Sequence, residues 1–217
     1  YLDKFSQLLD TDVNMIIFGD SELESFVWAK RSPNNTQFVT RPQSWFKGEF
    51  YDRIQEIRTN PDWYNLAGWL KDSTQAKLEM YNPLVMSKMF LLHDAVILDK
   101  FDSDKLYWID AGLANTVHMG YFTHDNVLPK IDRLFDNFTF ICFPYQADRE
   151  IHGFDIDRMT QLTGVRVDKV ARGGFFGGTK EKIREMNGLY YNLMKTTLQR
   201  GLMGTEESLF SILLYNN

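Results

Sequence analysis

The sequence has a single cysteine, Cys142, in 217 residues. One thiol excludes an intrachain disulfide and is typical of a reducing compartment, so we expect a cytoplasmic protein. The sequence also lacks a signal peptide, and none of its apolar stretches is long enough to span a bilayer. We therefore predict no transmembrane segment.

Positive charge is scarce as well. The 24 Lys and Arg residues stand against 29 Asp and Glu, which gives a formal net charge of −5. A protein that binds a nucleic-acid backbone needs concentrated Lys and Arg, and this chain has neither that excess nor a run of like charges. We expect no nucleic-acid partner.

The sequence also shows none of the common spacings of metal-binding or triad enzymes. Its histidines, His93, His118, His124 and His152, form no His-x-x-x-His pair. No Ser/His/Asp order and no Cys/His pairing stands out. Only His118 and His124, in the loop after Asp110, are considered further as ligands.

What the sequence does contain is an alternation of apolar strands and amphipathic helices. Predominantly apolar runs occur at 13–19, 106–109 and 138–143. Strands without polar alternation, separated by helices, predict a sheet that is covered on both faces. We therefore predict a single α/β domain over residues 1–217, with a mixed, mostly parallel central sheet flanked by helices. Because the chain opens within an amphipathic helix, we expect a further strand to precede residue 1.

One of these strands ends at a carboxylate. The apolar run stops at Asp110, and two small residues, Ala111 and Gly112, follow; Asp20 ends an earlier strand in the same way. In α/β sheets, ligands collect beyond the carboxyl ends of the strands. A carboxylate there can hold a divalent cation, orient a ribose hydroxyl or cap the next turn. The small neighbours favour a ligand, which needs backbone close by.

Lys88 has an unusual place on a predicted helix. Its neighbours on one face are Leu84, Leu91, Leu92 and Ala95. A lysine in such a position either snorkels to the surface or meets an anion at the edge of the sheet.

Two further stretches leave their roles open. The segment RGGFFGG at 172–178 is typical either of a ligand contact or of a tight strand-to-helix turn with two core phenylalanines. Glu206 and Glu207 begin a predicted helix, where each stabilises the first turn by about 0.3–1 kcal/mol. At the mouth of a cleft the same pair supplies a base, a nucleophile or a stabilising charge.

Taken together, five segments resemble the HtrL/WlaTC-like (YibB-type) family of bacterial surface-polysaccharide glycosyltransferases. The segments are YNPLVMSKMFLL (81–92), YWIDAGLANTV (107–117), EIHGF (150–154), VARGGFFGG (170–178) and GTEESLFSILLY (204–215). The resemblance implies a GT-A-like fold, which is a nucleotide-binding α/β domain that takes nucleotide-sugar donors. In that family a strand with a threonine-rich tip comes before the first helix, and it does not occur here.

A more distant likeness, to the retaining α-1,3-galactosyltransferase and blood-group transferase family, implies roles for single residues. That pattern has a basic residue on a helix, an Asp-x-Asp strand end, an FGGT turn, a long helix and an acidic segment, in this order. The match implies that Lys88 contacts the donor phosphate and that Asp110 is the first motif aspartate and the metal ligand. Glu207, with Glu206 as its rival, would act beneath the reacting sugar.

The same likeness implies where the two substrates bind. The expected donor contacts are Asp110, Ala111, Gly112 and Lys88, with Asp20 and Arg31 near the base. The expected acceptor-side wall is formed by Phe175, Phe176, Gly177 and Gly178. Gly112 stands where the pattern has its second aspartate, so dependence on Mn²⁺ or Mg²⁺ is left open.

We therefore predict a glycosyltransferase that moves a hexose from a nucleotide sugar, a UDP-sugar, to a hydroxyl of a glycan-type acceptor in surface polysaccharide synthesis. The alternative is a non-catalytic carbohydrate- or partner-binding domain with a degenerate GT-A fold, which Gly112 favours. A third reading, a sugar-nucleotide nucleotidyltransferase, predicts a glycine-rich loop with a basic residue after the first strand. The sequence shows no such loop.

Overall fold

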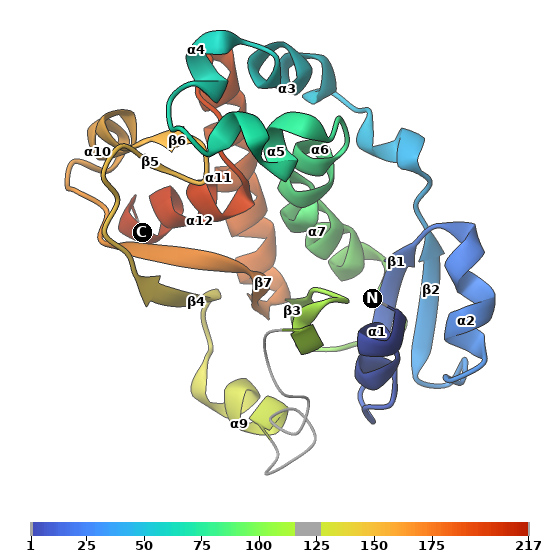
Figure 1. The fold of residues 1–217 in the computed structure, drawn as a ribbon. Coiled ribbons are helices and arrows are strands. Elements are labelled where there is room, and N and C mark those ends of the chain that lie inside the picture. Colours follow the sequence, from blue (N-terminus) through green and yellow to red (C-terminus); the bar gives the residue numbers. More distant parts are fainter. Residues whose placement is uncertain (1, 116–126, 217) are drawn as a thin grey trace. The chain divides into compact units, whose positions relative to one another are not determined.

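The computed structural model describes residues 2–115 and 127–216 (Figure 1). These residues gather into two compact units, each made of segments that are distant in the sequence. Of the described residues, the first unit comprises 2–45, 91–115, 127–139 and 174–183, and the second comprises 46–90, 140–173 and 184–216.

The first unit holds short helices and two pairs of strands, with η marking a 3-10 helix. Its elements are α1 (Leu2–Leu9), β1 (Met15–Gly19), η1 (Ser21–Leu23), α2 (Glu24–Trp28), β2 (Thr36–Thr40), β3 (Lys105–Ile109), η4 (Leu113–Asn115) and α9 (Val127–Leu134). Five elements have residues in both units: η2 (Gln43–Phe46), α7 (Lys88–Leu98), β4 (Thr139–Pro144), β7 (Lys169–Thr179) and α11 (Lys180–Gln199).

The second unit is mostly helical. Its elements are α3 (Tyr51–Arg58), α4 (Pro61–Tyr64), η3 (Leu70–Asp72), α5 (Thr74–Lys77), α6 (Tyr81–Met86), β5 (Glu150–Ile151), β6 (Phe154–Asp155), α10 (Ile156–Thr163) and α12 (Glu206–Asn216). In the part of the chain that the structure describes, no helix is both long and apolar enough to cross a membrane.

The α/β class is confirmed, and the strands expected at 13–19, 106–109 and 138–143 are present as β1, β3 and β4. The prediction of one mostly parallel sheet is wrong for the described residues. They form three small sheets, with orders β1-β2, β3-β7-β4 and β5-β6. The β1–β2 pair is parallel, whereas the β3–β7 and β5–β6 pairs are antiparallel.

Coverage of both sheet faces is also incomplete. In β4, the side chains of Ile141 and Phe143 are 43% and 57% exposed. A largely apolar run therefore did not mean a fully covered strand here.

The segment RGGFFGG does not form the expected turn, because it lies inside the long strand β7. Gly177 has a φ of 154°, and a Cβ on it would lie 2.2 Å from the carbonyl oxygen of Leu106. A Cβ on Gly178 would lie 2.5 Å from the carbonyl oxygen of Asn137. These two glycines serve the close approach of neighbouring backbone rather than a turn.

The core of the first unit joins α1 and α2 to the β1–β2 pair, which lie side by side in Figure 1. Phe5, Leu8 and Leu9 of α1 are buried, as expected from the spacing of an amphipathic helix. The ring of Phe5 stacks on that of Phe26, with 6.1 Å between centroids. Burying each large apolar side chain stabilises the fold by about 1.5–3 kcal/mol.

Arg31 ties the segments around this core together. Its Nε donates to the hydroxyl of Thr36 at 2.6 Å, and its Nη1 donates to the carbonyl oxygens of Leu9 and Thr11 at 2.8 and 2.6 Å. Its Nη2 donates to the carbonyl oxygens of Val13 and Asn35. Burial lowers the pKa of the guanidinium, although the charge of Asp12 opposes the shift. With five hydrogen bonds to protein oxygens, Arg31 holds the fold rather than facing a donor base.

Replacing Arg31 by Met leaves these carbonyl oxygens without their donors. We expect the free energy of unfolding to fall by about 3 kcal/mol, because a lost hydrogen bond to a charged group and an unsatisfied buried acceptor each cost about 1–3 kcal/mol. Urea unfolding followed by circular dichroism measures the change. Arg31→Lys keeps the positive charge, so its free energy of unfolding should fall less than that of Arg31→Met.

Lys30→Ala is the matched control, since its ion pair with Asp10 lies at the surface and contributes little. Equal stabilities for the Arg31→Met and Lys30→Ala variants would contradict the role of Arg31.

Candidate functional site

The two predicted glutamates form the first turn of α12. This helix is buried over most of its length, including Leu209, Phe210 and Ile212, so it carries both carboxylates into the second unit. The phenol of Tyr190, itself fully buried, donates to the carbonyl oxygen of Met86. Burial and the nearby Glu206 hold the pKa of Tyr190 well above its ordinary value.

Glu206 forms a buried ion pair with Lys88, the first residue of α7. The Lys88 Nζ lies 2.7 Å from Glu206 Oε1, and the two side chains are 11% and 5% exposed. Lys88 also donates to the carbonyl oxygen of Gly173 at 3.2 Å. The anion that Lys88 meets is thus a carboxylate of its own chain, and snorkelling does not occur. Its expected contact with a donor phosphate stays a prediction.

Gly173 of β7 contacts both glutamates. Its N–H donates to Glu207 Oε1 at 2.9 Å. A Cβ at this position would lie 2.1 Å from Glu206 Oε1, so only glycine leaves room for that carboxylate. The glycine expected to admit a ligand instead admits the carboxylate of Glu206.

Glu207 faces two nitrogen-bearing side chains. Its Oε2 lies 3.1 Å from Nη1 of Arg172 and 3.1 Å from Nε2 of His152. The side chain of Glu207 is 14% exposed, whereas that of Arg172 is 46% exposed. Glu207 is therefore a mostly buried carboxylate with one oxygen held by the backbone and the other turned towards a cation and an imidazole.

A tight hairpin positions His152. Strands β5 and β6 are joined by His152 and Gly153, with φ values of 50° and 91°. Positive φ at both central residues is the geometry of a type I′ turn, and histidine is among the residues that tolerate it best. The N–H of Gly153 donates to Glu150 Oε2 at 2.8 Å, and its carbonyl accepts from the indole of Trp63 at 3.0 Å.

α12 also fastens the same hairpin. The hydroxyl of Ser208 donates to the carbonyl oxygen of Ile151 at 2.8 Å. The helix that carries the glutamates therefore also holds the turn that carries His152, which fixes the distance between them.

Burial lowers the pKa of His152 below its ordinary value of 6.5. The charge of Glu207 opposes the shift, Arg172 adds to it, and Glu150 opposes it. The imidazole is thus held in its neutral form near neutral pH.

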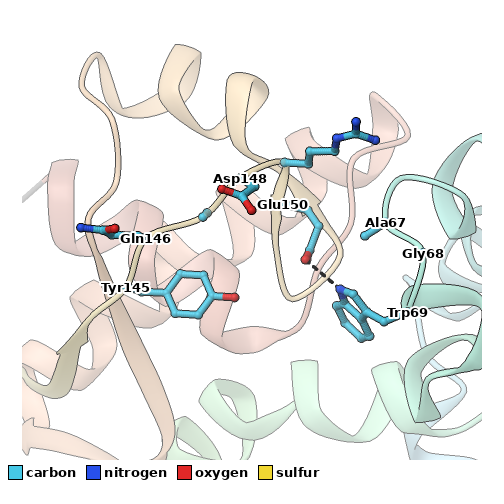
Figure 2. A pocket seen from close by; sticks show the side chains of 9 residues that line it. Ala67, Gly68, Trp69, Tyr145, Gln146, Asp148 and Glu150 are labelled. Atoms are coloured by element: carbon cyan, nitrogen blue, oxygen red, sulfur yellow. Dashed lines mark hydrogen bonds between the residues drawn. The ribbon is translucent and has the colours of Figure 1, made fainter.

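A pocket lies beside this arrangement, within the second unit. We call it the Trp69 pocket; it has a volume of 370 Å³ and is lined by Ala67, Gly68, Trp69, Tyr145, Gln146, Ala147, Asp148, Arg149 and Glu150. In Figure 2, Trp69 and Tyr145 stand on two sides of it, and the carboxylates of Asp148 and Glu150 come from the segment between. The rings of Tyr145 and His152 are 6.2 Å apart, so the pocket adjoins the surroundings of Glu207.

The predicted donor residues Asp110 and Asp20 lie in the first unit. Asp110 follows β3, and its Oδ1 accepts from the indole of Trp108 at 2.6 Å. Asp20 caps η1 by accepting from the N–H of Glu22 at 3.4 Å, so the turn-cap interpretation holds for it. Since Lys88 and Glu207 belong to the second unit, their joint action with Asp110 on one donor stays a prediction.

Ala111 and Gly112 have local roles in the fold. Ala111 packs against the core of the first unit. The carbonyl oxygen of Gly112 accepts from the backbone and side-chain nitrogens of Asn115, which closes the turn at η4.

The expected acceptor wall is a core strand. Phe175 and Phe176 are only 4% and 0% exposed. Their rings stack on Tyr107 and Trp108, with 5.4 and 6.1 Å between centroids. Together with the tightly packed Gly177 and Gly178, they offer no open face to a sugar.

The described residues do not assemble a full metal site. Between residues 2–115 and 127–216, no three His, Cys, Asp or Glu side chains are placed to hold an ion. Asp110 brings one carboxylate, and Gly112 brings none. His118 and His124 lie outside the described residues.

His152 and Arg172, which face Glu207, and Trp69, which lines the adjoining pocket, were not predicted to act there. His152 and Arg172 stand in segments that carry the family resemblance, EIHGF and VARGGFFGG. The His-Gly pair between Ile151 and Phe154 was a signal for a two-residue hairpin. Trp69 had no comparable signal, because only the folded chain brings it to Glu150.

The family comparison adds to this geometry. The model of the family described as "Bacterial protein of unknown function (HtrL_YibB)" matches residues 1–217. The chain belongs to this family. The resemblance stated for HtrL/WlaTC-like proteins is thereby confirmed as to family. No curated protein and no solved structure gave a significant match.

In this HtrL_YibB family member, Lys88→Met removes the ammonium partner of the buried Glu206 carboxylate. We expect the free energy of unfolding to fall by about 3–5 kcal/mol, the typical cost of breaking a buried ion pair from one side. The double variant Lys88→Met, Glu206→Leu should recover most of it, since both charges are gone. Chemical unfolding of the two variants and the wild type measures this.

Lys47→Ala serves as the control, because its pair with Glu79 is exposed and should barely change stability. A double variant no more stable than Lys88→Met would contradict the assignment.

The lowered pKa of His152 predicts a pH dependence of stability. Below about pH 6.5 the unfolded chain binds a proton that the folded chain resists, so the free energy of unfolding falls as pH decreases. The loss is complete below the folded-state pKa. Asparagine also tolerates a positive φ, so His152→Asn keeps the turn. This variant lacks the fall in the free energy of unfolding that protonation of His152 causes.

Urea unfolding of both proteins between about pH 5 and pH 8 tests the shift. The stability of the wild type relative to His152→Asn should decrease with falling pH. Parallel curves would show that the folded chain does not resist the proton.

Proposed function

We propose that the chain is a glycosyltransferase with a GT-A-like fold that moves a hexose from a UDP-sugar to a hydroxyl of a glycan-type acceptor. The observation that carries the proposal is the setting of Glu207. Its carboxylate is mostly buried, oriented by the N–H of Gly173, and set beside Arg172 and the neutral imidazole of His152. The order of Lys88, Asp110, Phe-Gly-Gly and Glu206-Glu207 along the chain supports the same activity.

The reaction gives Glu207 a defined task. When the bond between C1 of the sugar and the diphosphate oxygen breaks, its electron pair leaves with UDP and positive charge develops at C1. A carboxylate beneath C1 stabilises that charge or bonds to the carbon. The acceptor oxygen then bonds to C1, and its proton passes to a base, for which the neutral imidazole of His152 is suited.

Glu206 is the weaker candidate for that task. Its charge is neutralised by Lys88 at 2.7 Å, and its side chain is only 5% exposed. Glu207 has one oxygen turned towards Arg172, the more exposed partner, and so is the better placed of the two. In this proposal Glu206 holds Lys88 and Glu207 acts on the sugar.

The departing UDP needs positive charge nearby, since its diphosphate gains negative charge as the bond breaks. The proposed donor-diphosphate contacts are Lys88, which would exchange its ion pair with Glu206 for the diphosphate, and Asp110, which would bind Mn²⁺ or Mg²⁺ together with it. One carboxylate is a poor donor set for a metal by itself, so no step here depends on the ion. A single unpaired thiol, Cys142, and a nucleotide-sugar donor fit a cytoplasmic enzyme.

Hydrolysis of UDP-sugars by purified variants tests the proposal. Glu207→Gln should lower the turnover by about 10²–10⁴-fold, because it removes the charge that acts on C1 while keeping the shape. Asp110→Asn should weaken the donor contact and raise KM. Glu206→Gln, which changes the neighbouring carboxylate, is the matched control. Its turnover should fall less than that of Glu207→Gln.

If folded Glu207→Gln and Asp110→Asn variants keep the wild-type turnover, the site assignment is contradicted. The second candidate function is a non-catalytic binding module, which Gly112 favours. Calorimetry with UDP, with and without Mn²⁺, then distinguishes this module from the glycosyltransferase. An enzyme binds UDP in at least one condition, whereas a binding module of this kind binds it in neither.

A further inference from the structure

The Trp69 pocket has no assigned role in the reaction described above. Its volume of 370 Å³ falls within the range of about 300–1,000 Å³ that is usual for small-molecule sites. All of its lining comes from two short segments of the second unit, 67–69 and 145–150. The pocket is therefore built by one compact part of the chain.

Trp69 offers an aromatic face that is already fixed in place. Its side chain is among the exposed large apolar ones, at 46%, yet its Nε1 donates to Glu150 Oε1 at 3.0 Å. Glu150 is itself buried, and its other oxygen accepts from the N–H of Gly153. A ring held at its polar edge with its face open binds a ligand at little cost in side-chain entropy.

Tyr145 stands on another side of the pocket and remains protonated. Burial raises the pKa of its phenol, and the charges of Glu150 and Asp148 raise it further. The hydroxyl can therefore both donate and accept a hydrogen bond. Gln146, Asp148 and Arg149 are exposed beside it and add donors and acceptors.

This mixture suits a pyranose ring. A pyranose has an apolar C–H face that stacks on an indole and a rim of hydroxyls, each of which donates and accepts. A cationic ligand fits less well. Both oxygens of Glu150 are already taken by N–H donors of the protein, and Arg149 brings a positive charge into the lining.

We propose that the Trp69 pocket binds a pyranose of the acceptor glycan, an inference that rests on the proposed glycosyltransferase activity. The ring of Tyr145 lies 6.2 Å from that of His152, and His152 Nε2 lies 3.1 Å from Glu207. The Trp69 pocket therefore adjoins the residues around Glu207. The pocket takes the place of the expected wall at 175–178, which is buried.

Saturation-transfer NMR with methyl β-D-galactopyranoside and methyl α-D-glucopyranoside tests the pocket directly. In the wild type, saturating the aromatic protons should transfer signal to the ring C–H protons of at least one probe. Trp69→Ala should reduce that signal at least about 5-fold, since stacking on the ring is lost. Phe143→Ala, which removes an exposed aromatic outside the pocket lining, should leave it unchanged.

Asp148→Asn is the second variant, because this exposed residue can be changed without disturbing the fold. It should weaken binding several-fold through the loss of an ionic acceptor. If Trp69→Ala fails to fold by circular dichroism, Asp148→Asn decides the question. Equal signals in the wild type and in both folded variants would overturn the proposal, as would a pocket-dependent signal from tetramethylammonium in place of the sugars.

UDP-sugar hydrolysis, measured in parallel without an acceptor, separates the two proposals. A wild type that hydrolyses a UDP-sugar but shows no pyranoside signal overturns the pocket assignment and leaves the proposed activity standing. A Trp69-dependent pyranoside signal without hydrolysis supports the sugar pocket and counts against the transferase.

Discussion

The second unit depends on the placement of two adjacent carboxylates inside it. Two buried negative charges side by side are tolerated only if each is compensated, and the chain uses a different means for each. Glu206 receives a full positive charge from Lys88, whereas Glu207 receives a backbone N–H and the partly exposed guanidinium of Arg172. The backbone of Gly173 serves both arrangements, because its carbonyl accepts from Lys88 and its N–H donates to Glu207.

This division gives neighbouring residues of the same type unequal chemistry. Glu206, paired with a buried ammonium group, stabilises the fold. Glu207 lies beside the partly exposed Arg172, so its negative charge is less fully compensated within the protein. Glutamates at a helix start are common enough to need no functional explanation. Their burial, and the cost of that burial, is what points to a site.

Helices and strands were predictable where the sequence pattern extends over only a few neighbouring residues. The strand before Asp110 and the helices at 180–199 and 206–216 follow from apolar runs and helical spacing. Strand pairing was not predictable in the same way, since an apolar run such as 138–143 is compatible with parallel or antiparallel partners. The glycines of RGGFFGG are compatible with a ligand contact, a turn or close backbone packing, and only the strand neighbours decide among these. For the candidate site, Glu207 was singled out by a resemblance, and its role stays a prediction. His152, Arg172 and Trp69 were not, since pairs such as Trp69 and Glu150 are separated by 81 positions.

Glu150 connects the Trp69 pocket to the turn that carries His152, because its two oxygens accept hydrogen bonds from both. One of its oxygens holds the indole of Trp69, the other holds the turn of His152, and its charge raises the pKa of that imidazole. A ligand that shifts Glu150 through Trp69 alters the proton affinity of His152. By reciprocity, a proton on His152 alters the affinity for that ligand by the same factor. In the proposed sugar site, occupancy of the pocket and protonation of the imidazole would therefore be linked equilibria, joined through a single carboxylate.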